Sequence, residues 1–489
     1  MTRDLRRRAL ESNKTVSKKA ASRVGSKTAS ATDSQTNSRT QSRDVSCHAS
    51  EEDNGDSSDD DDDDATSWSL NSIDDIAQDP NKVSLNWILE LRDRIEEIID
   101  QKKSSDVGRE RALKAYNNYL MVKYCYDEIE NSTADLYPAF CKSLRAPRGE
   151  KEACLALRAI GLTLITCPSD DVYEDMFKTL ERVYQRSEYV TVKAAAIRTV
   201  SALAIYGGAS DAEVGEVMDQ FLEIVESDGN SIDAADSAEV VTAACEEWGN
   251  LATFVDDLQE KTEAAMDAFV DQLESSSTSV QIAAGENIAL IYEKSYTPRE
   301  VDDPDPTKDE KVDEDGFPLD YSHVKRYEPF GEKNRLETIL LELAKVSSKH
   351  ISKKDRKTLH ATFGDILVTI KYPVRGPRYS NVLNESGKLQ GSRMNIRMDK
   401  TEDVPIDKWW KSHRLQALRR VLGGGFMIHY QDNEVIHSSL PALAEGTEIV
   451  PRKFGEFRGE SRKAKHPDPY HIKSRQPLRY SPDPEDDVY

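Results

Sequence analysis

Three features of this 489-residue chain contain residue types that could do chemistry. The triple glycine Gly423 to Gly425 could cradle a phosphate, but no Lys-Ser or Lys-Thr pair follows it and no strand precedes it. His429 and His437 lie eight residues apart with two acids between them, whereas metal-ligating histidines on a helix are usually four apart. The remaining serines, histidines and acids form no nucleophile elbow. We therefore expect no catalytic residue, metal, cofactor or small-molecule substrate.

The glycines and histidines lie in a basic, aromatic segment, Pro405 to Ile436. Leucines at positions 415, 418 and 422 line one face of a helix predicted over 406–422, and cations surround the other face. The glycines would end or kink this helix, because each costs about 1 kcal/mol in a helix interior. At least one of Trp409 and Trp410 should pack on a core, although one could stack on a base. The two histidines are interpreted as packing or RNA-facing groups, so the segment predicts a binding surface.

The elements that would position this segment are helical from about Val83 to Tyr296. Small residues recur 40, 48 and 40 positions apart: Ala156, Ala196, Ala244 and Ala284. Apolar residues follow each alanine four positions later, and three of them again seven positions later: Ile160, Val200, Trp248, Ile288, Leu203, Leu251 and Ile291. A period of about 40–47 residues is typical of HEAT and armadillo arrays. The pattern predicts an all-α, armadillo/HEAT-like α-solenoid, with a nonrepetitive helical bundle as the alternative.

Composition divides the chain into five predicted parts. They are a disordered leader (1–78), an armadillo-like helical repeat domain (79–297), a flexible acidic insertion (298–330), a helical C-terminal domain (331–437) and a basic aromatic tail (438–489). The leader has too few large apolar residues to offset its ordering entropy. Within the C-terminal domain, residues 372–404 read as a long loop with possible short strands at Val382 to Leu389 and Met394 to Met398.

The net charge of -23 is unevenly distributed. Residues 349–420 contain 17 Lys or Arg against 7 Asp or Glu, and residues 451–480 contain 9 against 3. The net charge argues against a nonspecific nucleic-acid coat, while a basic end with aromatic residues favours RNA contact. The RNA-binding candidates in the tail are Arg452, Lys453, Arg458, Arg462, Lys463, Lys465, Lys473, Arg475 and Arg479. The candidates for stacking on bases are Phe454, Phe457, Tyr470, His471 and Tyr480.

Six cysteines without a CxxC pair predict buried thiols in a reducing compartment. No apolar run approaches the roughly 18 residues needed to span a bilayer, and the leader lacks an apolar signal core. We expect a cytoplasmic protein without membrane contact. It could also enter the nucleus, since Arg6 to Arg8 and Lys18 with Lys19 could form an import signal, a second RNA arm or simply a solvated tail.

Two motifs resemble a known family. PIDKWW followed by LQALRRVLGGGFMIHYQDNEVI, and SKKDRKTLHATFGDIL at 352–367, resemble the C-terminal domain of the interferon-related developmental regulator family, in a fungal-type member. The chain departs from the family pattern at Gly364, where Arg is frequent, at Leu415, where Tyr is found, and at His437 with Ser438, where Arg and Asp are found. Residues carried over as a family-motif surface are Lys353, Lys354, Arg356, Trp409, Arg414, Gly423, Gly425, His429 and Asn433.

The resemblance implies an N-terminal armadillo-type array, a C-terminal family domain and a noncatalytic regulator. Some members bind translationally inactive ribosomes with a C-terminal helix in the mRNA and tRNA path. Animal members are also described as transcriptional coregulators linked to histone deacetylase complexes. We expect a protein whose basic tail occupies the mRNA and tRNA path of inactive 80S ribosomes, contacting rRNA and ribosomal proteins. The alternative is a nuclear adaptor that binds a repressor complex.

Overall fold

The computed structural model describes residues 86–100, 105–145, 149–303, 322–345, 353–383, 389–392, 394–398 and 403–441. These residues belong to one compact unit. The leader at 1–78, most of the acidic insertion and the tail after Pro441 lie outside the described residues.

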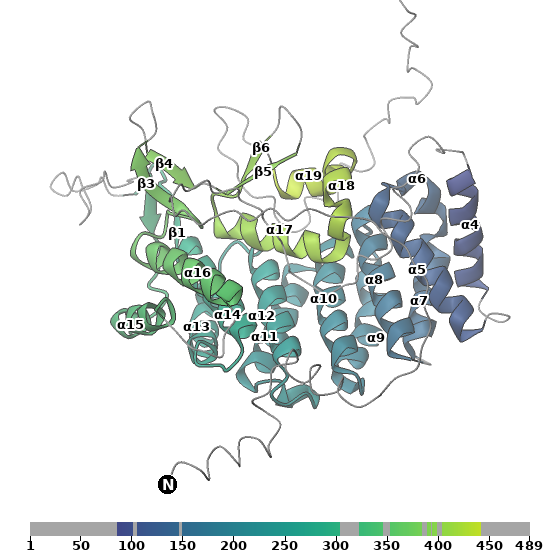
Figure 1. Ribbon diagram of the computed structural model, residues 1–489, viewed down its shortest axis with the longest axis horizontal. Coiled ribbons are helices and arrows are strands. Elements are labelled where there is room, and N and C mark those ends of the chain that lie inside the picture. The colour runs from purple at the N-terminus through teal and green to yellow at the C-terminus, as the bar shows by residue number, and fades with distance from the viewer. Residues whose placement is uncertain are drawn as a thin grey trace, which may run out of the picture. The chain divides into compact units, whose positions relative to one another are not determined.

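The fold is a series of helical hairpins, each made of an outer and an inner helix (Figure 1). The outer row consists of α4 (Asn86–Ile99), α7 (Thr133–Arg145), α9 (Val172–Arg186), α11 (Asp211–Glu226), α13 (Gln259–Gln272) and α15 (Lys333–Leu343). The inner row consists of α5 (Asp106–Val122), α8 (Glu150–Thr166), α10 (Val190–Tyr206), α12 (Ala238–Ala252), α14 (Thr278–Lys294) and α16 (Lys353–Lys371). Each inner helix contacts the next inner helix and its own outer partner. The predicted α-solenoid is confirmed.

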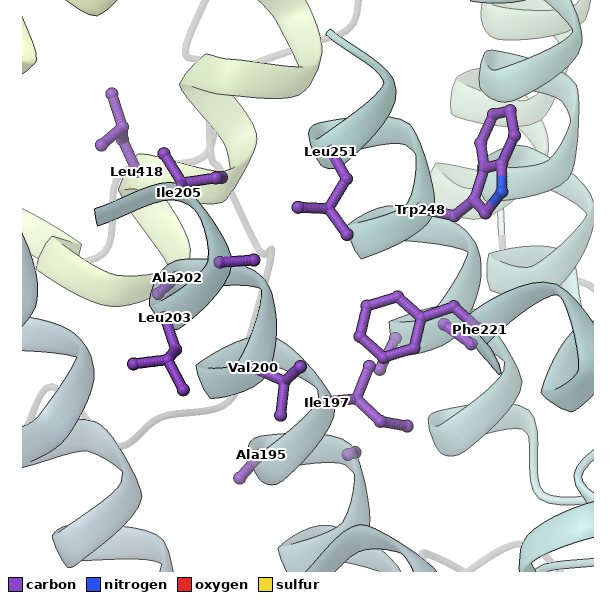
Figure 2. Packing of buried hydrophobic residues seen from close by; sticks show 14 of the residues in the cluster. Ala195, Ile197, Val200, Ala202, Leu203, Ile205, Phe221, Trp248, Leu251 and Leu418 are labelled. Atoms are coloured by element: carbon purple, nitrogen blue, oxygen red, sulfur yellow. The ribbon is translucent and has the colours of Figure 1, made fainter. Parts of the chain in front are cut away.

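The aligned small residues explain the spacing of the inner row. Ala156, Ala196, Ala244 and Ala284 lie on α8, α10, α12 and α14, and all four are fully buried. The apolar residues predicted four and seven positions later are also buried, Trp248 being 1% exposed. A methyl side chain at each crossing lets the adjacent helix approach, and the larger residues complete the same buried face. Figure 2 shows this packing around α10, with Phe221 and Trp248 on the side of α11 and α12.

Local signals set several helix ends. Ser210 and Glu213 form a reciprocal capping box at the start of α11, and the Ser237 hydroxyl caps α12. The connection between these helices includes a short 3₁₀ turn, η3 (Asn230–Ile232), and has positive φ at Asp228 and Asp233. Aspartate adopts left-handed backbone angles more readily than most residues. The two aspartates therefore allow this tight connection. A similar short connection, α6 (Tyr126–Ile129) with η2 (Glu130–Ser132), joins α5 to α7.

Three small antiparallel strand pairs interrupt the helices. β1 (Tyr296–Pro298) pairs with β2 (His323–Lys325), β3 (Tyr379–Leu383) with β4 (Leu389–Ser392), and β5 (Asn395–Arg397) with β6 (Asp403–Pro405). The strand predicted at 394–398 agrees with β5. The strand predicted at 382–389 was misplaced, since β3 ends where that strand should begin. Tyr379 and Ser380, at the start of β3, were read as loop.

The C-terminal helices return to the inner row. α17 (Trp409–Leu422) contacts α8, α12 and α14, and Leu418 lies beside Ala202 and Ile205 of α10 (Figures 1 and 2). The helix predicted from position 406 begins at Trp409. The predicted kink is confirmed, because the three glycines form a 3₁₀ turn, η4 (Gly423–Gly425), between α17 and α18 (Phe426–Asp432). α19 (Glu434–Ser439) follows directly.

Two other expectations concern burial and membranes. Among the described cysteines, four are buried and Cys154 is half-buried, in agreement with their interpretation as small core residues. None of the described helices is both long and apolar enough to cross a bilayer.

Candidate functional site

The N-terminus of α17 is held by one carboxylate from α14. Glu293 accepts hydrogen bonds from the backbone N–H groups of Trp409, at 2.8 Å, and Trp410, at 3.1 Å. A negative charge here satisfies two unpaired donors and interacts favourably with the positive end of the helix dipole. Burial raises the pKa of Glu293, while nearby Lys408 and these two hydrogen bonds oppose the rise.

The two tryptophans serve packing. Trp409 is 2% exposed, and its indole Nε1–H donates to the Thr369 hydroxyl of α16 over 2.8 Å. Trp410 is 9% exposed, and its ring lies 4.9 Å from the Arg414 guanidinium. Neither ring is open enough to stack on a nucleotide base. The expected packing role is therefore confirmed for both residues, and the stacking alternative is wrong.

Arg414 is a cation buried among neutral acceptors. It is 2% exposed, and it donates to the Thr253 hydroxyl at 2.9 Å, the Thr253 carbonyl at 3.0 Å and the Ser439 carbonyl at 3.2 Å. The ring of Phe254 stacks on the guanidinium with a separation of 3.8 Å. Burial lowers the pKa of Arg414 to about 9. The side chain links α17 to the end of α12 and to the end of α19, a structural role that needs all of its fork-shaped donors.

An ordered series of charges on the inner row matches the direction of α17. The residue two positions after each of the four aligned alanines is Arg158, Arg198, Glu246 or Glu286 in turn. The two arginines therefore lie toward the C-terminal end of α17, and the two glutamates toward its N-terminal end, where Glu293 also lies. Because a helix is positive at its N-terminus and negative at its C-terminus, this order favours the observed orientation.

Specific contacts connect this series to α17. Arg158 donates to the Val421 carbonyl at 3.3 Å, close to the C-terminal end of α17. Arg420 donates to the Glu247 carboxylate at 2.8 Å and lies 3.6 Å from Glu246. The amide of Gln416 donates to Glu286 at 3.2 Å. Burial raises the pKa of Glu286 to about 7. The cationic face of α17 therefore meets acids of α12 and α14.

The glycine turn allows the chain to cross α5 closely. A Cβ at Gly425 would lie 1.7 Å from the Met121 carbonyl oxygen, and Gly423 has φ of 54°. Beyond the turn, His429 Nε2 donates to the Leu120 carbonyl over 2.6 Å, and burial lowers the pKa of His429. Nε2 must carry the proton in this contact, because a carbonyl oxygen can only accept. Asn433 donates to the Ile165 carbonyl at 2.9 Å and caps α19 through Val435.

The expectation of an exposed family-motif surface is wrong for five of its residues. Trp409, Arg414, Gly425, His429 and Asn433 are all buried against the inner row or the turn after α5. The error has a physical cause. A basic amphipathic sequence predicts a helix with an exposed cationic face, but here carboxylates and carbonyl groups of other helices accept hydrogen bonds from its cations. Sequence reasoning missed Glu246, Glu247, Glu286 and Glu293 as their partners. One signal in the sequence could have revealed these partners: acidic residues recur close to the aligned alanines, on helices that are otherwise apolar.

Two of the remaining motif residues are more accessible. Gly423 and Arg356 are half-buried, and Lys353 with Lys354 begin α16. His437 is exposed on α19, whereas His429 is buried, and no group of metal-ligating side chains occurs among the described residues. All nine basic and five aromatic candidates of the tail lie outside the described residues.

These contacts define the class of protein: an α-solenoid scaffold whose inner row is covered over α8–α14 by its own C-terminal helix. The sequence model of the interferon-related developmental regulator family matches residues 48–371. The chain therefore belongs to that family. The match includes the motif at 352–367 and ends before Pro405, so the second motif remains a resemblance.

Relatives support the same assignment. An uncharacterized protein of Schizosaccharomyces pombe is 32% identical over 360 residues, which cover 73% of this chain and 74% of the relative. Interferon-related developmental regulator 1 of Mus musculus is 21% identical over 368 residues, covering 71% and 72% respectively. The human protein of the same name is 22% identical over 216 residues, covering 43% and 38%. The named relatives are thus described as regulators.

Proposed function

We propose that this protein is a noncatalytic ribosome-binding regulator whose basic C-terminal tail occupies the mRNA and tRNA path of inactive 80S ribosomes. The observation that carries the proposal is the tail's composition, with nine Lys or Arg against three acids over 451–480 and five interleaved aromatic or imidazole rings. Cations neutralise phosphates and rings stack on unpaired bases, which is the chemistry of a single-stranded RNA channel.

The folded part supports the proposal by fixing where the tail begins. α18 and α19 are tied to α5 and α8 through His429 and Asn433, and the Tyr430 hydroxyl donates to the Leu440 carbonyl at 2.9 Å. A binding segment joined to a body that is docked nearby has a raised effective concentration at its own site. Residues 65–348 are predominantly acidic, so they should avoid rRNA and leave binding to the basic regions.

The proposal is tested by cosedimentation of the full-length protein with purified 80S ribosomes at low salt. Replacing the nine tail cations with glutamine should weaken binding by well over tenfold, because contacts with six to ten phosphates make affinity strongly salt-dependent. A matched control replaces nine of the eleven Lys or Arg residues in positions 1–45 and should retain binding. A tail variant that still cosediments and still excludes mRNA as well as the unaltered protein would refute the proposal.

A nuclear adaptor for a histone deacetylase-type complex is the competing function, reached through the family resemblance. Armadillo arrays can hold extended peptides along their inner helices. In this protein α17 covers the inner row from α8 to α14, which argues against peptide capture at that place. Fractionation distinguishes the two functions: an adaptor would sediment away from ribosomes in a complex that survives ribonuclease.

A further inference from the structure

A small cleft lies at the C-terminal end of α16, close to the start of α17. It has a volume of about 200 Å³. Seven residues of α15, α16, the following turn and the start of β3 line it: Leu341, Leu367, Val368, Lys371, Tyr372, Arg375 and Tyr379. We call it the cation–aromatic cleft. Leu341 is 43% exposed, so the cleft offers solvent an apolar floor beside cationic and aromatic walls.

The cleft contains a preformed stack of rings and a guanidinium. Arg375 lies 3.9 Å from the ring centroid of Tyr372 and 5.0 Å from that of Tyr379. Cation–π contact with two rings restricts the rotamers of all three side chains. Tyrosine rings and planar guanidinium groups are the surfaces on which unpaired RNA bases stack. The cleft therefore presents a stacking platform that needs little ordering when it binds.

The turn that carries this platform is rigid. Arg375 donates its backbone N–H to the Tyr372 carbonyl at 2.9 Å, and its own carbonyl accepts from the Thr369 hydroxyl at 2.8 Å. The Lys408 ammonium donates to the Val374 carbonyl at 3.1 Å. A Cβ at Gly376 would lie 1.9 Å from the Asp407 carbonyl oxygen, so the turn also packs directly on the chain before α17.

Arg378 is held in a conformation that ordinary residues avoid. Its φ is 52°, and its backbone N–H donates to the Asp365 carboxylate. This bond and the positive charge of Arg378 both oppose the rise that burial causes in the pKa of Asp365. The left-handed region is unfavourable for a non-glycine residue, and such residues are concentrated at functional sites. Arg378 is exposed and directly precedes Tyr379 of the cleft, and Lys371, which lines the cleft, is also exposed.

Charge identifies the kind of partner. Lys371 and Arg378 lie within a stretch, 349–420, with 17 bases and 7 acids, in a protein whose net charge is -23. Two exposed cations beside a stack of rings suit phosphates that flank an unpaired base. Most ribosomal proteins are basic and would be repelled, so of the two ribosomal components RNA is the complementary one.

We propose that the cation–aromatic cleft is a second RNA contact of this protein, which binds an unpaired rRNA segment by stacking a base near Tyr372 and Tyr379 and pairing its phosphates with Lys371 and Arg378. The choice of ribosomal RNA as the partner rests on the proposed function, but the contact itself is made by the folded part of the chain and not by the tail.

The test uses the full-length protein and a short unpaired RNA oligonucleotide. Two variants disrupt the cleft: Tyr379→Ala removes a ring, and the double variant Lys371→Glu with Arg378→Glu reverses both charges. Lys151→Glu with Lys178→Glu reverses two exposed charges on α8 and α9 and serves as the matched control. Unchanged circular dichroism and Tm establish that each variant folds.

Each cleft variant should weaken oligonucleotide binding about tenfold, and the charge reversal should lower the salt slope by about 1.4, since each single-strand phosphate contact contributes about 0.7. The control should bind within about twofold of the unaltered protein. Ultraviolet crosslinking should join the RNA to a peptide containing Tyr372 or Tyr379. Unchanged affinity with no such crosslink would overturn the proposal.

Two further outcomes separate this inference from the proposed function. If the tail variant still occupies 80S ribosomes but the cleft variants lose RNA binding, the tail proposal fails and the cleft proposal holds. If the cleft variants lose 80S binding but keep full affinity for protein-free rRNA, the cleft contacts a ribosomal protein, and the RNA proposal is overturned.

Discussion

Arg414 shows how a single side chain can be both costly and necessary. A buried guanidinium loses its hydration, and the pKa lowered to about 9 reflects that cost. It is retained because three oxygens and two rings surround it. Removing the side chain would leave the buried carbonyl groups of Thr253 and Ser439 without this donor. Leaving a buried acceptor unsatisfied costs more free energy than the intact hydrogen bond contributes to stability.

Arg414→Ala should therefore lower the free energy of unfolding by about 3 kcal/mol. Arg414→Met keeps most of the volume and removes the buried charge, so its loss should be less than half as large. Urea denaturation measures both, with exposed Arg111→Ala as a control expected within about 0.5 kcal/mol of the unaltered protein. Equal losses for alanine and methionine would show that the lost hydrogen bonds, rather than the lost side-chain volume, dominate.

Glu286 makes stability depend on pH. Burial raises its folded-state pKa to about 7, and Gln416, Arg420 and Glu246 are the neighbours that affect it. Its ordinary pKa is about 4.3, so the unfolded chain releases this proton at lower pH than the folded chain. The stabilising contribution is thus fully present below about pH 4 and is lost as pH rises toward 7.

Glu286→Gln should remove this loss. The variant should gain about 1 kcal/mol of stability relative to the unaltered protein between pH 5 and pH 8, a value reduced for the partial exposure of the carboxylate. Urea unfolding at the two pH values measures the difference. A stability difference that stays constant with pH would show that Glu286 is ionised throughout.

Helix α17 is the element whose position depends most on distant residues. Its first turn is capped by Glu293 of α14, and its last turn meets Arg158 of α8. Glu293→Gln keeps the shape but replaces an anionic acceptor with a neutral amide. We expect a loss of about 1–3 kcal/mol, together with faster hydrogen exchange at the backbone amides of Trp409, Trp410 and Lys411.

The matched control for this prediction is Glu239→Gln, which neutralises an exposed acid in the first turn of α12. Its effect should stay within about 0.5 kcal/mol. If Glu293→Gln changed exchange no more than this control, the cap would not be what orients α17.

The helices also show what a sequence can and cannot predict. The inner row was predictable because Ala156, Ala196, Ala244 and Ala284 repeat at nearly constant spacing, and local periodicity reports local packing. The burial of α17 was not predictable in this way. Its partners Glu247 and Glu293 lie 173 and 116 residues earlier in the chain, and nothing in local composition records such pairings.

Across the molecule, the roles proposed for the described fold and for the basic tail are separable. The last described contacts join Leu440 to Tyr430 and Ile436, and α18 and α19 bury Phe426, Tyr430, Ile436 and Leu440. Stability should therefore depend on the chain up to about Pro441. Ribosome binding should depend on the residues after it, because most of the cations outside the folded part lie there or in the leader.

Two truncations test this division. Deleting 442–489 should leave Tm within about 2 °C of the full-length value, while abolishing 80S cosedimentation at moderate salt. Deleting from Phe426 onward also removes four buried side chains, each contributing about 1.5–3 kcal/mol, and exposes the faces of α5 and α8 that they cover. Tm should then fall by at least about 5 °C. Equal melting temperatures for the two truncations would mean that α18 and α19 do not stabilise the array, and that the tail lacks the rigid base from which its insertion is argued.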